Sequence, residues 1–175
     1  LCRQELNRAK ALLFHKRIKE DYRAHLILDN LPAATRVVEP ATPNAPQRVI
    51  TIYERGFPVG FKGSAEIPGT SAGANYLYNH HRLVFKYHME PSFEGSRIVG
   101  FEVEPLSVKH QYKGMFTTDI TKLNLLTVPV GPDLPPQPVQ FSPGPAAENE
   151  LVYTYDVKWE YSDIRWASRW DLYLY

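Results

Sequence analysis

The sequence contains a single cysteine, Cys2, so no disulfide can form within the chain. A lone thiol is either a leftover free cysteine or one half of a disulfide whose partner lies upstream. Because the chain begins at Leu1 and not at a methionine, we expect it to be a fragment of a longer protein. No Asn-x-Ser/Thr sequon occurs either, so one common mark of a secretory-pathway surface is missing.

An excess of charge of one sign is also missing. The chain has 20 basic residues against 19 acidic ones, which gives a net charge of +1. A nucleic-acid-binding domain usually needs a basic face, and binding to anionic lipid usually needs a polybasic segment. The composition therefore argues against nucleic acid as a partner.

Long apolar runs and catalytic motifs are absent too. No window reaches the ~18 apolar residues of a membrane span, and no signal peptide is present. The sequence has no nucleophile elbow, phosphate loop, HExxH helix or paired CxxC motif. The glycines of "GFPVGF" (Gly56 to Phe61) lack a strand-to-helix context and are better explained as strand kinks. We therefore predict no enzyme, no cofactor and no catalytic residue.

Four histidines are the candidates for a metal site. His80, His81 and His88 lie close in sequence, and His110 follows later. On a strand, eight residues at ~3.3 Å each separate His80 from His88 too far to share a metal, and His81 faces the other side. No carboxylate or cysteine stands at ligand spacing, so we predict ordinary strand and turn histidines.

The residues that are abundant favour β-structure. The chain has 11 tyrosines, 8 phenylalanines and 15 prolines, a composition typical of strands joined by loops. Its 175 residues are long enough for one domain with a sizeable core. Only Gln4 to Asp21 predicts an amphipathic helix, with Leu6, Leu13, Phe14 and Ile18 near helical spacing.

Period-two patterns predict the strands, and Pro- or Gly-rich stretches predict the loops. Strands are expected at residues 22–29, 48–61, 81–89, 97–105 and 151–161, with turns at 29–32 and 89–96 and loops at 39–47, 63–74 and 127–150. The last strand places Leu151, Val157 and the aromatic residues on one face and polar residues on the other. The predicted fold class is mainly β: an antiparallel β-sandwich with one N-terminal amphipathic helix and long Pro-rich loops.

Aromatic side chains crowd one face of that last strand. Tyr153, Tyr155, Trp159 and Tyr161 all alternate with polar residues. Such a face is usually plain core, although exposed rings of this kind can also stack on sugars. We predict core.

Five blocks of the sequence, taken in order, resemble a known family. They are "EDYRAHLILDNLPAATR", "GFPVGF", "YLYNHHRLVFKYH", "RIVGFEVEPLSVKH" and "YTYDVKWEYSDIRWASRWDLYL". Together they resemble the lumenal N-terminal domain of the nonaspanins, the transmembrane nine superfamily, over essentially the whole chain. "DNLPAA" and "DIRWASRWDLYL" are the most specific blocks. Lys113 to Glu150 carries no block of the family, and the further cysteines that its members often have are absent here.

The resemblance implies a single lumenal domain over residues 1–175, belonging to a multispanning protein of Golgi and endosomal membranes. The family is associated with sorting and surface delivery of other membrane proteins. The resemblance also implies that residues 162–175 are the junction with the first membrane helix, after which eight more helices follow. The expected partners are the protein's own transmembrane domain, the lipid headgroup layer and client membrane proteins.

The terminal block supplies the candidate functional positions. If it is helical, Trp166 and Trp170 are i,i+4 neighbours, placed as tryptophans commonly are at a headgroup layer. Alternatively, the tryptophans pack within the domain while Arg165 and Arg169 pair with Asp163 or Asp171. The candidate membrane-junction or interaction residues are Trp159, Asp163, Arg165, Trp166, Arg169, Trp170 and Asp171.

Three functional classes follow from these patterns. The first is a non-catalytic lumenal interaction domain in a sorting protein. The second is a glycan-binding β-sandwich module that uses exposed aromatic residues. The third is an extracytoplasmic lid of a transporter or channel, in which the membrane helices do the work.

Overall fold

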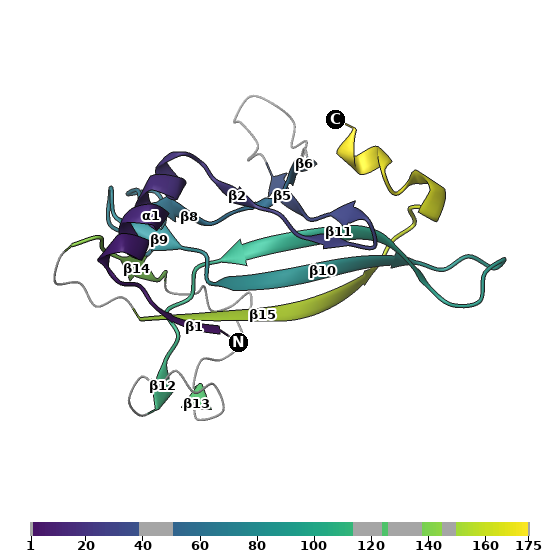
Figure 1. Ribbon diagram of the computed structural model, residues 1–175. Coiled ribbons are helices and arrows are strands. Elements are labelled where there is room, and N and C mark those ends of the chain that lie inside the picture. The colour runs from purple at the N-terminus through teal and green to yellow at the C-terminus, as the bar shows by residue number, and fades with distance from the viewer. Residues whose placement is uncertain (1, 39–50, 114–123, 126–137, 145–149, 175) are drawn as a thin grey trace. The chain divides into compact units, whose positions relative to one another are not determined.

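The structure is a computed structural model that describes residues 2–38, 51–113, 124–125, 138–144 and 150–174 (Figure 1). The described residues form a mainly β fold with one α-helix, α1 (Arg8–Lys19). The strands are β1 (Cys2–Glu5), β2 (Arg23–Ala24), β3 (Ile27–Leu28), β4 (Leu31–Pro32), β5 (Ala34–Val38), β6 (Thr51–Arg55), β7 (Phe57–Pro58), β8 (Gly60–Lys62), β9 (Asn75–Leu77), β10 (His80–His88), β11 (Arg97–Leu106), β12 (Tyr112–Lys113), β13 (Asn124–Leu125), β14 (Gln140–Phe141) and β15 (Glu150–Tyr161). Two 3-10 helices, η2 (Trp166–Ser168) and η3 (Asp171–Tyr173), follow β15.

The chain divides into two compact units, each built from three separate stretches. Unit 1 comprises residues 1–22, 58–81 and 105–155, and unit 2 comprises residues 23–57, 82–104 and 156–175. The long strands β10, β11 and β15 contribute residues to both units. The division is therefore not one into consecutive domains, and the single lumenal domain stays a prediction.

Unit 1 packs α1 against a small sheet of strand order β14-β9-β8. Its core contains Leu6, Ala11, Leu77, Phe141 and Leu151. Gly60 in β8 is required by this packing, because a Cβ there would collide with the carbonyl oxygen of Tyr76 and with the side chain of Ile18. The glycine lets the helix approach the strand closely.

The N-terminal helix is shorter than the sequence pattern predicted. Cys2–Glu5 forms β1, which pairs with the start of β15, and the helix begins only after Asn7, whose side-chain oxygen accepts a hydrogen bond from the Lys10 amide. Asparagine at this position caps the first turn. The buried stripe of the helix runs through Ala11, Phe14 and Ile18, whereas Leu12 and Leu13 are exposed. The prediction that Leu13 faces the core was wrong.

Unit 2 contains the strand order β15-β10-β11-β5-β6 of the largest sheet. The arrows of β10 and β11 run in opposite directions in Figure 1, and β5 pairs antiparallel with β6. The pairing of β11 with β5, however, is parallel, with Glu102 opposite Ala34. The sheet is therefore mixed and not purely antiparallel as predicted, and the stacking of sheets into a sandwich stays a prediction.

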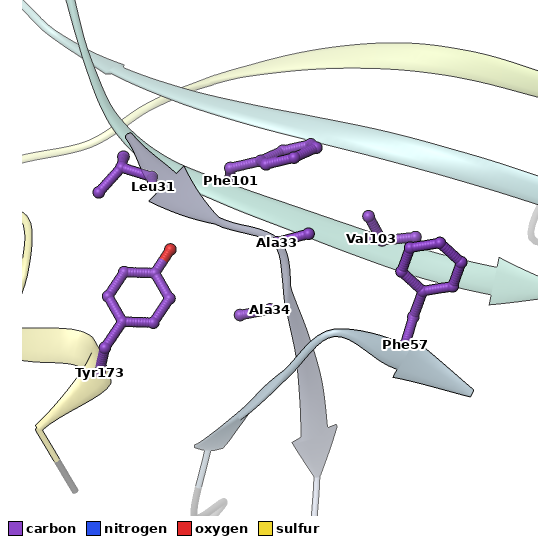
Figure 2. Close-up of a cluster of buried hydrophobic side chains, with 7 residues drawn as sticks. All are labelled: Leu31, Ala33, Ala34, Phe57, Phe101, Val103 and Tyr173. Carbon is purple, nitrogen blue, oxygen red and sulfur yellow. The ribbon is translucent and has the colours of Figure 1, made fainter. Parts of the chain in front are cut away.

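The core of unit 2 lies around β11. Figure 2 shows its buried members, which are Leu31, Ala33, Ala34, Phe57, Phe101, Val103 and Tyr173. Six of them come from the strands and their connections, and the seventh, Tyr173, comes from η3 near the C-terminus. The terminal block of the sequence is thus anchored in this core.

Several predicted boundaries are confirmed and others are corrected. The turn at 29–32 is present, with Asp29 and Asn30 at positive φ between β3 and β4, and Gly56 at φ +71° makes the predicted kink after β6. The loop at 63–74 and the turn at 89–96 are also confirmed. The predicted strand at 22–29 is broken into β2 and β3. Residues 39–47 lie outside the described residues.

The stretch 127–150 was predicted to be an extended loop, and the structure corrects this in part. Gln140–Phe141 forms β14, which pairs with β9, and Phe141 is buried in the core of unit 1. A local pattern could not reveal this pairing, because its partner strand lies more than 60 residues earlier. Residues 126–137 and 145–149 lie outside the described residues.

Candidate functional site

The predicted junction residues lie in unit 2, on β15 and on the two 3-10 turns that follow it. η2 and η3 do not form one continuous helix, so Trp166 and Trp170 are not stacked at α-helical i,i+4 spacing. The turns are closed by i→i+3 bonds, such as Ser168 N to Arg165 O at 2.9 Å and Tyr173 N to Trp170 O at 3.0 Å. Short 3-10 turns of this kind end after one turn because their hydrogen-bond geometry is poor.

Trp166 is held by two arginines and remains partly exposed. The guanidinium of Arg169 lies 3.8 Å from the centre of the Trp166 ring, and its Nη1 donates to the Trp166 carbonyl oxygen at 2.9 Å. The guanidinium of Arg97 lies 5.3 Å from the same ring. Guanidinium groups favour such positions over an indole face.

In its described part, the structure does not show the ion pairs that were predicted for the terminal block. Among the residues that the structure describes, no salt bridge joins Arg165 or Arg169 to Asp163 or Asp171. Intradomain packing of the block therefore rests on the contacts of Arg97 and Arg169 with the Trp166 ring and on buried Tyr173, and not on charge pairs.

Tyr173 fixes the end of the chain to the core of unit 2. Only 8% of its surface is exposed, and Leu172 packs against the same cluster. Burial raises the pKa of the Tyr173 hydroxyl to about 12 even though a hydrogen bond with the Phe101 backbone opposes this. Trp166, Trp170 and Leu174 are all exposed large apolar residues on the same short segment. The block thus has one buried anchor and several unburied aromatic or apolar side chains.

The aromatic face of β15 is not core over most of its length. Leu151 is buried and Tyr153 packs against the core of unit 1, but Tyr155 is 63% and Trp159 58% exposed. Val157 and Tyr161 are exposed as well. The prediction of a buried face was therefore wrong beyond Tyr153.

The face of β15 predicted to be wet is also partly buried. Val152 is buried, and the Asp156 carboxylate accepts a hydrogen bond from Arg82 Nε at 3.0 Å. Further along, Lys158 pairs with Glu160 at 2.7 Å. The partner of Asp156 comes from the neighbouring strand β10, whereas Lys158 and Glu160 both belong to β15. Alternation within one strand contains no information about a partner on another strand.

The exposed rings of β15 are ordered by contacts with half-buried rings of β10. Trp159 meets Phe85 edge-on with ring centres 4.9 Å apart, and Tyr87 meets Tyr161 edge-on at 5.9 Å. Edge-to-face pairs hold ring orientations. The result is a fixed aromatic surface on unit 2.

A cavity of about 490 Å³ opens beside this surface. It is lined by Tyr87, Ser96, Arg97, Ile98 and Trp159, all of unit 2. Only Trp159 among these was predicted as a site residue. The structure places the Arg97 guanidinium 4.0 Å from the centre of the Phe93 ring. The only sequence signal for this contact is that Phe93 lies four residues before Arg97.

Three of the four candidate histidines, His80, His81 and His110, lie in unit 1, but not in a metal-binding arrangement. His80 Nδ1 lies 2.7 Å from Thr154 Oγ1, which lies 3.0 Å from His110 Nε2. Burial, and then repulsion by His80, lower the pKa of His81 to about 4 and the pKa of His110 to about 4. His88 is in unit 2 and its Nδ1 lies 2.7 Å from the Ser162 carbonyl oxygen. Within the described residues, no group of three or more His, Cys, Asp or Glu side chains is arranged to hold a metal ion.

The part of the chain that the structure describes contains no helix with the length and apolarity needed to cross a membrane.

Comparison with known proteins places this chain beside proteins that are named for their membrane segments. The chain is 37% identical to transmembrane 9 superfamily member 10 of Arabidopsis thaliana over 180 residues, covering 99% of this chain and 26% of that protein. It is 36% identical to human transmembrane 9 superfamily member 4, covering 93% of this chain and 24% of that protein.

A more distant relative is putative phagocytic receptor 1a of Dictyostelium discoideum, which is 28% identical over 98% of this chain and 24% of its own length. The chain thus spans about a quarter of the length of the curated relatives it matches. No solved structure matches it. Residues 1–175 match the Endomembrane protein 70 family throughout. From this match and the relatives' identities, the chain belongs to the Endomembrane protein 70 family, the transmembrane 9 superfamily.

Proposed function

We propose that this chain is the lumenal, non-catalytic part of a Golgi or endosomal multispanning protein that takes part in the sorting of membrane proteins. Residues 162–175 form its contact with the headgroup layer and with the protein's own membrane helices. Membership of a family named for endomembrane and transmembrane proteins supports the setting. The exposed apolar side chains of the terminal block support the proposed contact with the headgroup layer.

One observation carries the contact proposal. Tyr173 is buried in the core of unit 2, while Trp166, Trp170 and Leu174 on the same segment are exposed. A segment anchored in the core by Tyr173 and Leu172 can present its exposed tryptophans to another surface. Tryptophan is favoured at the membrane interface because its ring and N–H suit a mixed environment. Client proteins would then be met by the rest of the lumenal surface.

The test uses the full-length protein and a glycan as the reporter. Glu94→Asn creates an Asn-Gly-Ser sequon in the exposed turn before β11, and only a lumenal sequon is glycosylated. We expect one glycan more on this variant than on Glu94→Gln, and conversion of this glycan to an Endo H-resistant form on passage through the Golgi. In the same background, Trp166→Ala or Trp170→Ala should lower the resistant fraction several-fold.

Tyr155→Ala is the matched control, because Tyr155 is an exposed aromatic residue of β15 outside the terminal block. It should leave the resistant fraction unchanged. A full-length Glu94→Asn variant without an added glycan, compared with Glu94→Gln, would contradict the lumenal placement. Normal maturation of both tryptophan variants would contradict the contact role of the terminal block.

A further inference from the structure

We propose that the cavity of unit 2 binds an acidic saccharide, with the sugar's carboxylate on Arg97 and its ring against Trp159. The sorting function does not require such a site. The site shares Trp166 with the terminal block, because the Arg97 guanidinium lies over that ring, and its ligand binding is measured separately from the contact of residues 162–175. Three observations carry the proposal. They are the lack of a carboxylate partner for Arg97 among the described residues, the exposed ring of Trp159 and the size of the cavity.

Arg97 is held in place without a carboxylate partner. Its guanidinium lies 4.0 Å from the centre of the Phe93 ring and 5.3 Å from the centre of the Trp166 ring. Rings interact with the flat faces of a guanidinium, whereas hydrogen-bond acceptors bind its N–H edge. Among the described residues, no side chain or carbonyl accepts from the Arg97 side chain and no acidic group pairs with it. The donor edge therefore remains for a ligand.

Two other strand arginines of unit 2 do have carboxylate partners. Arg23 pairs with Glu54 at 2.8 Å, and Arg82 pairs with Asp156 at 3.0 Å. The unit thus supplies carboxylates to the arginines of β2 and β10. At Arg97 it supplies two aromatic rings and a cavity wall instead. An arginine fork matches a carboxylate in two parallel hydrogen bonds, so the charge complement of this cavity is a carboxylate.

Trp159 supplies a flat apolar surface in the same cavity. It is more than half exposed, yet its ring is oriented by the edge-on contact with Phe85. An exposed ring that is already ordered loses little conformational freedom when a ligand stacks on it. A sugar offers a matching face of C–H groups, and its hydroxyls are suited to the polar atoms of Tyr87 and Ser96 in the wall.

The cavity volume of about 490 Å³ lies within the range of small-ligand sites. It suits one or two sugar rings. A phosphate on a lipid headgroup would also pair with Arg97, but a phosphate has no apolar face that could stack on the Trp159 ring. The aromatic wall therefore favours a saccharide over a lipid headgroup.

The experiment measures binding of two sugars that differ only in the carboxylate, glucuronic acid and glucose, to the purified full-length protein. Ligand-observed NMR suits the weak affinity of single sugars. We expect glucuronic acid to bind at least about tenfold more tightly than glucose, because the charge-assisted fork is available only to the acid. Arg97→Gln should abolish that preference, and Trp159→Leu should weaken both sugars by removing the flat ring.

Arg55→Gln is the matched control, since Arg55 is an exposed arginine of β6 that does not line the cavity. It should keep the affinity of the parent protein. If Arg97→Gln fails to fold, Arg97→Lys decides, because it keeps the charge beside the two rings and loses only the fork. That variant should lose most of the preference for the acid.

Equal affinity for the two sugars, no detectable binding of either, or a preference that survives both Arg97 variants would overturn the proposal. Glycerophosphoserine, the soluble headgroup of an anionic lipid, and inorganic phosphate provide the remaining arms. Binding of either one through Arg97 without binding of glucuronic acid would assign the cavity to a phosphate ligand and would also overturn the saccharide proposal.

Discussion

Asn79, in the connection between β9 and β10, binds the segment that follows β11 and the strand β15 through a single buried side chain. Its Nδ2 donates to the carbonyl oxygens of Val108 and Val152 at 2.7 and 2.9 Å, and its Oδ1 accepts from the Val108 amide at 2.7 Å. Its own backbone bonds to Leu106 and Thr154. Every polar atom of the side chain is therefore used, in a position that is 1% exposed. Such a fully satisfied polar group specifies one arrangement of the strands around it.

Asn79→Ala should destabilise the chain by about 3 kcal/mol or more, because it leaves the amide of Val108 and two carbonyl oxygens buried without partners. Chemical denaturation followed by circular dichroism measures this loss. Asn7→Ala, which removes only the cap of α1, is the comparison and should cost about 1 kcal/mol. Equal losses for the two variants would contradict the role assigned to Asn79.

Among the elements, η3 shows how a short segment is fixed by one side chain. Its three residues form a single 3-10 turn, which has little stability of its own. It packs against β6, and the Tyr173 ring points from η3 toward Leu31 of the core in Figure 2. The position of the whole terminal block therefore depends on burial of this ring.

Tyr173→Ala should cost about 3–5 kcal/mol, the usual range for removing a buried aromatic side chain. The terminal block should then detach, and limited proteolysis should cleave after Arg165 or Arg169 much faster than in the parent chain. Leu174→Ala is the control, because Leu174 is largely exposed and its loss should change neither stability nor cleavage. Unchanged cleavage of the Tyr173 variant would show that other contacts hold the block.

Elements with strong local patterns were predicted well from the sequence. β10, β11 and β15 were found within one or two residues, because period-two alternation over nine or more residues is a clear signal. The glycine kink at Gly56 was found because positive φ favours that residue. β1 and β14 were missed, since each is a short strand that exists only by pairing with a distant one.

Burial of the faces was less predictable than the strands themselves. The pattern of β15 placed Trp159 and Tyr161 on one face correctly but could not show whether anything covers that face. The same limit applied to the candidate site. Trp166 and Arg169 were recognised from the terminal block, whereas Arg97 and Tyr87 were missed, because only the fold brings β10 and β11 beside Trp159.

For the whole molecule, both units depend on contacts between distant parts of the chain. Unit 1 joins residues 1–22 to residues 105–155, and unit 2 joins residues 23–57 to residues 156–175. Neither unit can complete its core until the last third of the chain is present, because Leu151 and Tyr173 belong to those cores. Topologies with such non-local contacts fold slowly.

The stability of the molecule should also depend on pH through the histidine cluster of unit 1. Burial, followed by repulsion from His80, lowers the pKa of His81 and the pKa of His110 to about 4 from an ordinary value of 6.5. Below pH 6.5 the unfolded chain therefore binds more protons than the folded chain at these two sites. Their contribution to stability is complete above pH 6.5, falls as the pH decreases toward 4, and changes no further below that.

The expected loss is on the order of 2 kcal/mol for each histidine between about pH 6.5 and about pH 4, given their partial burial. Denaturant unfolding at several pH values from about 7.5 to about 4 measures it. The double variant His81→Asn with His110→Asn should show a clearly flatter dependence than the parent chain, since neither replacement can take up a proton. His25→Asn, at an exposed position of unit 2, should keep the parent slope. If the double variant has the slope of the parent chain, these two histidines do not supply the acid sensitivity, and it arises instead from the carboxylates that also titrate in this range.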